Sequence, residues 1–225
     1  MKKQTLWQGL TDWEQSPVLN LSKRIRIQMC IRKLKGKHSQ ARWEAVTALG
    51  NIAYTNPRNT IIKEAVPALV DALNDKDSGV RWKAAWVLVS IGIEHLRTVN
   101  VIVPALIYAL NDEDSCLRGH VIEGLGNILE KCQTLDQLME FEKALDEGFH
   151  SMRKRSQDRH EMNEAMSGIG KLITSLAKRR NELVEDKGIL LSDIPKPPKS
   201  GTIYRTLDSR LETTSRSVTE RVRNG

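Results

Sequence analysis

Cysteine and long apolar runs are both scarce in this sequence. Cys30, Cys116 and Cys132 form an odd set without a CxxC pair, so neither a disulfide framework nor a zinc ribbon is indicated. The longest uncharged run covers 98–111 and contains Pro104, and it is shorter than the ~20 residues that a membrane helix needs. No apolar signal-peptide core develops near the start. These absences argue against a secreted, membrane-spanning or disulfide-built protein and favour a cytoplasmic one.

Motifs that carry chemistry are also missing. The five histidines include no pair at positions i and i+4, and the sequence has no HExxH, GxSxG, Walker loop or GxGxxG. A cysteine nucleophile would need a histidine and a carboxylate beside it, and no motif places them there. We therefore expect no catalytic residue, no metal and no cofactor.

Aromatic residues make up only 4% of the chain, and five of the ten are tryptophan. Each tryptophan is therefore worth locating. The chain has a net positive charge, because 35 Lys and Arg exceed 28 Asp and Glu. A basic balance suits an anionic partner but does not indicate a fold.

An internal repeat dominates the middle of the sequence. Residues 66–78 read VPALVDALNDKDS, and residues 103–115 read VPALIYALNDEDS, at an offset of 37. An upstream copy places Arg42 in the frame of Arg81 at an offset of 39, and a weaker fourth copy begins at Thr134. Apolar residues at helical spacing flank the turn in each copy, so each copy predicts a pair of helices.

The turn between the two helices of a copy has helix-start chemistry. Asp77 and Asp114 precede serines, and their side-chain oxygens can accept the free N–H groups of a helix start. We therefore expect the second helices to begin there. Pro67 and Pro104 are expected inside the first helices, which they should bend.

This pattern resembles the HEAT repeat family, especially the short HEAT-like repeats of phycobilisome lyases and many prokaryotic proteins. In that family a Pro in the first helix is followed by an Asp eight residues later and by an Arg or Lys six residues after that. The two sets that fit are Pro67, Asp75, Arg81 and Pro104, Asp112, Arg118. The first copy keeps only Arg42, and the fourth keeps none. The resemblance implies an all-α, right-handed α-solenoid of about four helical hairpins, with the second helices on the concave side.

Three regions follow from the repeat and from shifts in composition. Residues 1–19 are expected to cap the first repeat, residues 20–186 to form the repeats, and residues 187–225 to form a basic, flexible tail. The four copies are expected at about 20–56, 57–94, 95–133 and 134–186. Stacked copies share one continuous core, and degenerate end copies suit a stack whose ends face water.

The arginines of the repeat are expected to hold the stack together. In the arrangement that the resemblance implies, each would pair with a turn aspartate of its own or a neighbouring copy. The residues of this ladder are Arg42, Arg81, Arg118, Asp75 and Asp112. We assign them a structural role.

A second set of residues predicts a binding surface. Trp43 and Trp82 occupy equivalent positions just after the ladder arginines, and Trp86 lies one turn beyond Trp82. Other residues already supply the apolar inward stripe of that helix, so the tryptophans are expected on the concave side. The full candidate patch is Trp43, Trp82, Lys83, Trp86, His120 and Glu123. The alternative is that the tryptophans pack against the neighbouring repeat.

Positive charge gathers near the start of the repeats. Residues 17–43 contain eight Lys and Arg and no acid. The candidate anion-binding residues are Lys23, Arg26, Lys33, Lys35 and Lys37, with further basic clusters at 153–155 and 178–180. A solvated convex face would explain them, and so would an anionic partner such as a nucleic-acid backbone.

These observations lead to a non-catalytic repeat module that binds another protein through its concave surface. One alternative is a nucleic-acid binder, because some HEAT-like proteins are DNA glycosylases that cradle DNA with concave Trp, Arg and a carboxylate. Glu44 or Glu123 would be the carboxylate here, although the motifs of that family are not matched. A further alternative, suggested only by the repeat subtype, is a bilin lyase or lyase-like chaperone. The sequence does not identify the partner or the oligomeric state.

Overall fold

Helices account for the regular structure of the described residues. The computed structural model describes residues 17–55, 60–155 and 159–187, and within these ranges it contains α-helices, short 3₁₀-helices and no strand. The predicted all-α fold is therefore confirmed. No helix in these ranges combines the length and the apolar character needed to cross a bilayer. The expected capping segment up to residue 16 and the expected tail from residue 188 lie outside the described residues.

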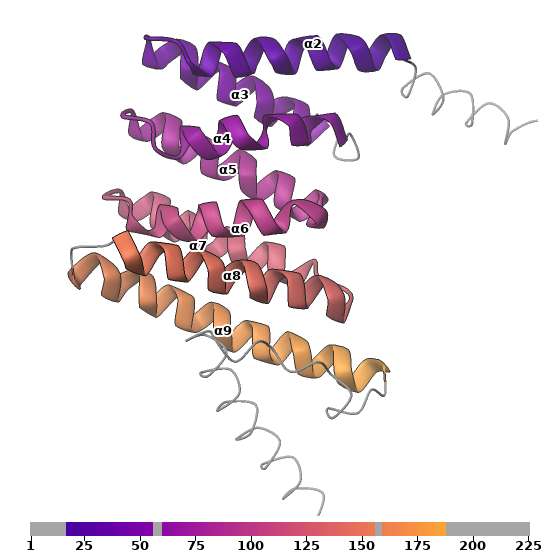
Figure 1. Ribbon diagram of the computed structural model, residues 1–225, viewed down its shortest axis with the longest axis vertical. Coiled ribbons are helices and arrows are strands. Elements are labelled where there is room, and N and C mark those ends of the chain that lie inside the picture. Colours follow the sequence, from indigo (N-terminus) through magenta and orange to yellow (C-terminus); the bar gives the residue numbers. More distant parts are fainter. Residues whose placement is uncertain (1–16, 56–59, 156–158, 188–225) are drawn as a thin grey trace, which may run out of the picture. The chain divides into compact units, whose positions relative to one another are not determined.

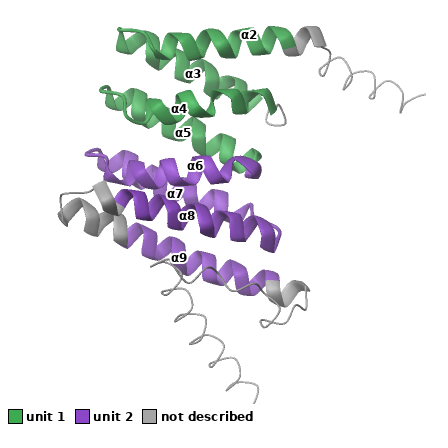
Figure 2. Ribbon diagram, viewed as in Figure 1, with its two compact units in different colours: residues 1–95 green, residues 96–225 purple. Residues whose placement is uncertain are grey.

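The chain divides into two compact units, residues 1–95 and 96–225 (Figure 2). In unit 1 the elements are α2 (Pro17–Leu34), α3 (Ser39–Thr55), η1 (Thr60–Ala65), α4 (Val66–Ala72) and α5 (Ser78–Glu94). The second helices of the two hairpins, α3 and α5, lie side by side, and α2 packs on α3 (Figure 1). Fully buried aliphatic residues fill this unit, including Ile27, Leu49, Leu69, Val80 and Leu88.

Unit 2 repeats the two-layer arrangement. Its elements are η2 (Leu96–Thr98), α6 (Val99–Tyr108), η3 (Ala109–Asn111), α7 (Ser115–Glu130), α8 (Leu135–Arg155) and α9 (Arg159–Lys187). The first helices α6 and α8 pack together, and the second helices α7 and α9 form the other layer. Gly148 on α8 allows a close approach of the two helices, because a β-carbon there would lie 2.8 Å from the backbone Cα of Pro104 on α6.

The two repeat prolines differ in their positions. Pro104 lies inside α6, as the sequence predicts. The expectation for Pro67 is wrong, because the preceding residues form a 3₁₀-helix and Pro67 occupies the first turn of α4. A proline is tolerated there, since the N–H groups of a first helical turn have no partner within the helix. The first layer of that repeat therefore consists of a 3₁₀ segment followed by a short α-helix.

Side-chain caps fix the start of the second helices. The Asp77 carboxylate accepts the N–H of Val80 at 3.1 Å, and Asp114 caps α7 in the same way. Two residues before each cap, a second aspartate accepts the backbone N–H of the capping residue: Asp75 from Asp77 and Asp112 from Asp114, both at 2.9 Å. The predicted N-caps are thus confirmed. Each turn thus contains two aspartates with different roles. The first accepts an N–H group within the turn, and the second accepts an N–H group of the first turn of the helix.

Candidate functional site

The aromatic side chains described in unit 1 lie on its second helices and not in its core. Trp43 and Tyr54 belong to α3, and Trp82 and Trp86 belong to α5. The exposed fractions are 41% for Trp43, 37% for Trp82 and 77% for Tyr54, whereas Trp86 is half-buried. Four large rings on one pair of helices, none of them fully buried, make this the first region to consider for binding.

Two close contacts show that α3 and α5 run in parallel. A β-carbon at Gly79 on α5 would lie 3.8 Å from Cδ1 of Trp43 on α3. Two turns further along, a β-carbon at Gly50 on α3 would lie 3.1 Å from Cζ3 of Trp86 on α5. On α5, Trp82 follows Gly79 by three residues and precedes Trp86 by four. Gly79, Trp82 and Trp86 therefore lie on one side of α5. The indoles of Trp43, Trp82 and Trp86 therefore share one face.

The third tryptophan is held from two sides. One edge of the Trp86 ring lies over Gly50, where only hydrogen leaves room for it. The Lys83 ammonium lies 4.3 Å from the ring centroid, a cation–π arrangement. Trp86 thus packs against the neighbouring repeat, while Trp43 and Trp82 present more of their rings to solvent. Packing against the neighbouring repeat, the alternative that the sequence left open, therefore holds for Trp86, and a binding role for Trp43 and Trp82 stays a prediction.

Tyr54 belongs to the same face, and the sequence reasoning missed it. It follows Trp43 by 11 residues, which is three turns of an α-helix, so the two rings project from one side of α3. That spacing is visible in the sequence, but Tyr54 has no aromatic counterpart in the next copy to attract notice. We call Trp43, Tyr54, Trp82, Lys83 and Trp86 the aromatic face of unit 1.

The remaining two residues of the predicted patch belong to α7 in unit 2. His120 is half-buried and Glu123 is exposed. Burial lowers the pKa of His120, and the nearby Glu123 carboxylate opposes that shift. Within unit 1, the structure brings together Trp43, Trp82 and Trp86 with Lys83.

The ladder arginine of the first copy makes a buried ion pair with the next copy. Nε of Arg42 donates to Oδ2 of Asp75 at 2.6 Å, and Nη2 donates to Oδ1 at 2.7 Å. The side chains are only 6% and 10% exposed. Paired, parallel hydrogen bonds of this kind fix geometry as well as energy. The contact joins α3 of one copy to the turn of the following copy.

The ion pair also sets the titration of its carboxylate. Burial by itself would raise the pKa of Asp75, but the hydrogen bonds from Arg42 and from the Asp77 N–H, together with the guanidinium charge, outweigh it. The pKa of Asp75 is therefore lowered. The carboxylate stays charged at neutral pH, as the paired geometry requires.

A shared backbone contact unites the three ladder arginines. Nη1 donates to a turn carbonyl six residues earlier, from Arg42 to Gly36 at 3.0 Å, from Arg81 to Asp75 at 3.0 Å, and from Arg118 to Asp112 at 2.7 Å. Arg42 thus uses a turn carbonyl of its own copy and a carboxylate of the next. Each arginine stabilises the turn that precedes its own helix.

Comparison with known protein families supports the resemblance seen in the sequence. Residues 27–101 match a family model described as HEAT repeats. Over about a third of its length, the chain is therefore similar to HEAT repeats. A search of curated proteins finds no match.

Solved structures of engineered proteins resemble the chain at low identity. One is 21% identical, covers 72% of this chain and 68% of its own, and aligns with a TM-score of 0.47. Another is 22% identical, covers 83% of this chain and 47% of its own, and also has a TM-score of 0.47. This chain therefore spans about half the length of the second protein.

Beyond the matched HEAT repeats, the last hairpin contains a different buried ion pair. Nη1 of Arg180 on α9 lies 3.5 Å from Oε1 of Glu142 on α8, with side chains 7% and 3% exposed. The sequence placed Arg180 in a basic cluster open to an anion. That placement is wrong, because Arg180 is buried against a carboxylate.

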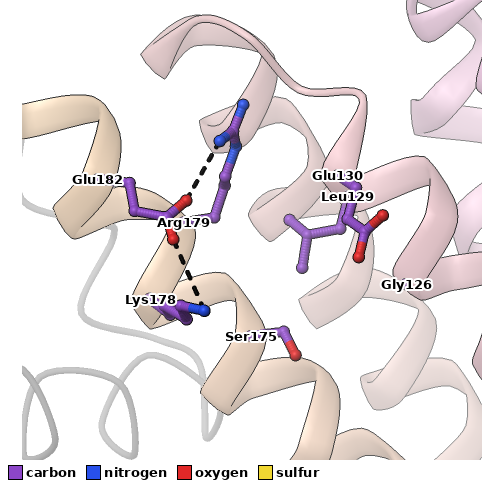
Figure 3. Close-up of a pocket in the computed structure, with 7 residues that line it drawn as sticks. All are labelled: Gly126, Leu129, Glu130, Ser175, Lys178, Arg179 and Glu182. Atoms are coloured by element: carbon purple, nitrogen blue, oxygen red, sulfur yellow. Dashed lines mark hydrogen bonds and ion pairs between the residues drawn. The ribbon is translucent and has the colours of Figure 1, made fainter. Parts of the chain in front are cut away.

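The other two members of that cluster line a cavity between α7 and α9 (Figure 3). Its volume is about 340 Å³, and it is lined by Gly126, Leu129, Glu130, Ser175, Lys178, Arg179 and Glu182. Both cations point to Glu182, at 3.8 Å from Lys178 and 3.2 Å from Arg179. Arg179 also donates to the backbone carbonyl of Cys132 at 3.2 Å. The cavity therefore lacks an excess of positive charge.

The candidate anion-binding residues before the HEAT match and within its first part are mostly exposed. Arg26, Lys33, Lys35 and Lys37 are exposed, and Lys23 is half-buried. A neighbour outside the candidate set is engaged, because Nε of Arg24 donates to Glu64 at 2.8 Å. The Arg24 hydrogen bond is the main cause of a lowered pKa at Glu64. These cations follow α2 and the turn after it.

Two further features bear on chemistry in the described residues, namely the placement of metal-ligating side chains and the buried thiol of Cys132. Among them, no group of three or more His, Cys, Asp or Glu side chains is placed to hold a metal ion. Cys132 is buried, and burial raises the pKa of its thiol to about 11. That thiol is protonated at neutral pH and is a poor nucleophile.

Proposed function

We propose that the chain is a protein-binding HEAT repeat module whose aromatic face anchors the partner. The observation that carries this proposal is the pair of exposed indoles, Trp43 and Trp82, on adjacent parallel helices. Tryptophan and tyrosine are enriched among the few residues that dominate interface energies. Rings that are large, rigid and amphipathic contribute binding area at a small entropic cost.

The composition of unit 1 supports a surface role for these rings. Its core is filled by aliphatic side chains and alanine, with Ile27, Val46, Leu49 and Leu88 fully buried. The aromatic face is therefore not needed to complete that core. A partner that brings apolar side chains to Trp43 and Trp82, with an acidic or carbonyl group near Lys83, would complement it.

The experiment isolates partners with the intact chain as bait and compares variants of the face. Trp43→Ala and Trp82→Ala should each weaken a recovered partner by more than about tenfold in calorimetry, since truncating a tryptophan anchor costs about 2 kcal/mol or more. Val101→Ala is the matched control, because Val101 is an apolar residue that is 49% exposed in unit 2. Equal loss in the control, or no loss in either tryptophan variant, would refute the proposal.

The exposed cations around α2 support a second candidate, a nucleic-acid partner. Arg26, Lys33, Lys35 and Lys37 are all exposed. Phosphate contacts release counterions, so such binding falls steeply as salt rises. Binding that disappears between 50 and 200 mM salt, and that Lys33→Ala damages more than Trp82→Ala, would favour this candidate over the first.

A further inference from the structure

The first described helix exposes an apolar stripe away from the core. Leu21, Ile25 and Met29 on α2 are 59%, 52% and 53% exposed, whereas Ile27 on the opposite side is fully buried. Their spacing of four residues places them on one side of the helix, and the stripe is about 12 Å long at 1.5 Å per residue. Within unit 1, α2 is the terminal helix (Figure 2). No earlier repeat of the described chain lies against this side of it.

The residues that lead into α2 have a pattern that matches the stripe. In residues 5–16, Leu6, Leu10 and Trp13 are spaced by four and three, the spacing of one side of a helix. A helix over 6–13 would also be about 12 Å long. If it folded back on α2 in the antiparallel direction, Trp13 would meet Leu21, and the other two would meet Ile25 and Met29.

Charge selects this occupant over others. Residues 5–16 contain Asp12 and Glu14 and no Lys or Arg, whereas α2 contains Lys and Arg and no acid. A second copy meeting through α2 would bring two basic helices together. The residues 202–225 contain five Arg and three Asp or Glu, so they too have a net positive charge. Of these three candidates, only the segment before α2 offers the opposite sign together with matched apolar spacing.

We propose that residues 5–16 form an amphipathic helix that docks antiparallel on Leu21, Ile25 and Met29 and closes the end of the repeat stack. Asp12 and Glu14 then bring negative charge to a helix whose charged side chains, Lys and Arg, are all basic. The apolar stripe of α2 is consequently an internal contact and not a site for another molecule. This inference is independent of the proposed function, which uses residues of α3 and α5 and not the exposed stripe of α2.

Hydrogen exchange of the intact chain, followed by mass spectrometry, tests the docking directly. Backbone amides of residues 6–14 should exchange at least about tenfold more slowly than in an isolated peptide of residues 1–16. Ile25→Gln should abolish that protection, because it places an amide at the centre of the stripe. Since Ile25 is already half-exposed, the repeats themselves should keep their protection. Asp12→Asn should reduce the protection of residues 6–14 without removing it.

Val101→Gln is the matched control, because it replaces a similarly exposed apolar residue of unit 2 and should leave residues 6–14 protected. Exchange of residues 6–14 at the rate of the isolated peptide would overturn the proposal. So would protection that survives Ile25→Gln. Protection of α2 that increases with protein concentration, while residues 6–14 stay unprotected, would instead assign the stripe to self-association.

Discussion

The two units of the molecule differ in where most of their described aromatic residues lie. In unit 1 the rings of Trp43, Tyr54 and Trp82 are exposed over a core of aliphatic residues. In unit 2 the rings of Phe141 and Phe149 are buried, at 0% and 5% exposure, and Tyr108 is half-buried. The same repeat architecture thus accommodates large aromatic side chains either in the core or on the surface. The comparison teaches that unit 1 is complete without its aromatics, and this frees them for a surface task.

The buried charges of the two units differ as well. The Arg42–Asp75 pair uses paired short hydrogen bonds, and both residues have further bonds to the turns. The Glu142–Arg180 pair approaches only to 3.5 Å and lies inside the last hairpin. One pair is part of the repeated turn, and the other is a single contact between two helices.

The largest expected effect is the difference in stability between truncating the buried ring of Phe141 and truncating the exposed ring of Trp82. Phe141→Ala should lower the free energy of unfolding by about 3–5 kcal/mol, because it leaves a cavity in the core of unit 2. Trp82→Ala should cost well under half of that, since the indole already meets solvent. Chemical denaturation of both variants measures the difference. Equal losses would mean that Trp82 is a core residue of unit 1.

Double replacements by apolar residues sharpen the comparison of the two ion pairs. Glu142→Leu with Arg180→Met should leave the Tm within about 2 °C or raise it, because packed apolar residues often replace a buried pair without loss. Arg42→Met with Asp75→Leu should lower the Tm by roughly 5–10 °C, since it also removes hydrogen bonds to two turns. Calorimetry gives both values. A larger fall in Tm for the Glu142/Arg180 double variant than for the Arg42/Asp75 double variant would mean that the ion pair of the last hairpin contributes more to stability.

The pH dependence of stability should reveal the first pair. The pKa of Asp75 is lowered in the folded chain, so an unfolded chain, with a carboxyl near pKa 3.9, binds the proton first as pH falls. The stabilisation is therefore fully present above about pH 4 and is lost as pH falls through the folded pKa. Asp75→Asn should melt earlier than the parent at pH 7, and the gap should narrow towards pH 3. A constant gap would contradict the assignment.

The smallest expected effects concern two helical glycines of unit 2. Gly148→Ala should destabilise the chain by about 1–3 kcal/mol, because its β-carbon would meet the backbone of Pro104 at 2.8 Å. Gly126→Ala should stabilise it by about 0.5–1 kcal/mol, since a β-carbon there meets nothing within 4 Å. Thermal melts of the pair test the close α6–α8 approach. Similar changes in both variants would argue against it.

The repeat made part of this structure predictable from sequence. Equivalent spacing in two copies identified the aspartate caps and the Arg42 and Asp75 positions before any coordinates. Pro67 was misplaced because spacing alone does not distinguish a 3₁₀ segment from an α-helical one. The Glu142–Arg180 pair was missed because the last copy lacks the repeated residues, and a tertiary contact without a pattern leaves no signal.

The exposed stripe of α2 was missed for a related reason. Leu21, Ile25 and Met29 share one side of the helix and Ile27 lies on the other, and the spacing alone does not show which of these two apolar sides meets solvent. An apolar residue in a sequence indicates burial, but it does not show which part of the protein or which partner covers it. Tyr54 is not predictable from the repeat, because the equivalent position of the next copy is Ile93.

The contact between each ladder arginine and the carbonyl six residues earlier has a consequence for altering the chain. The copies differ in length, with offsets of 39 and 37 between their arginines, yet the six-residue interval from turn to arginine is the same in all three. Insertions and deletions should therefore be tolerated elsewhere in a copy, for example between α3 and η1, and not within this interval. The six residues from turn carbonyl to arginine therefore have a constant length, whereas the rest of a copy varies. A copy should be added or removed by joining the chain outside this interval.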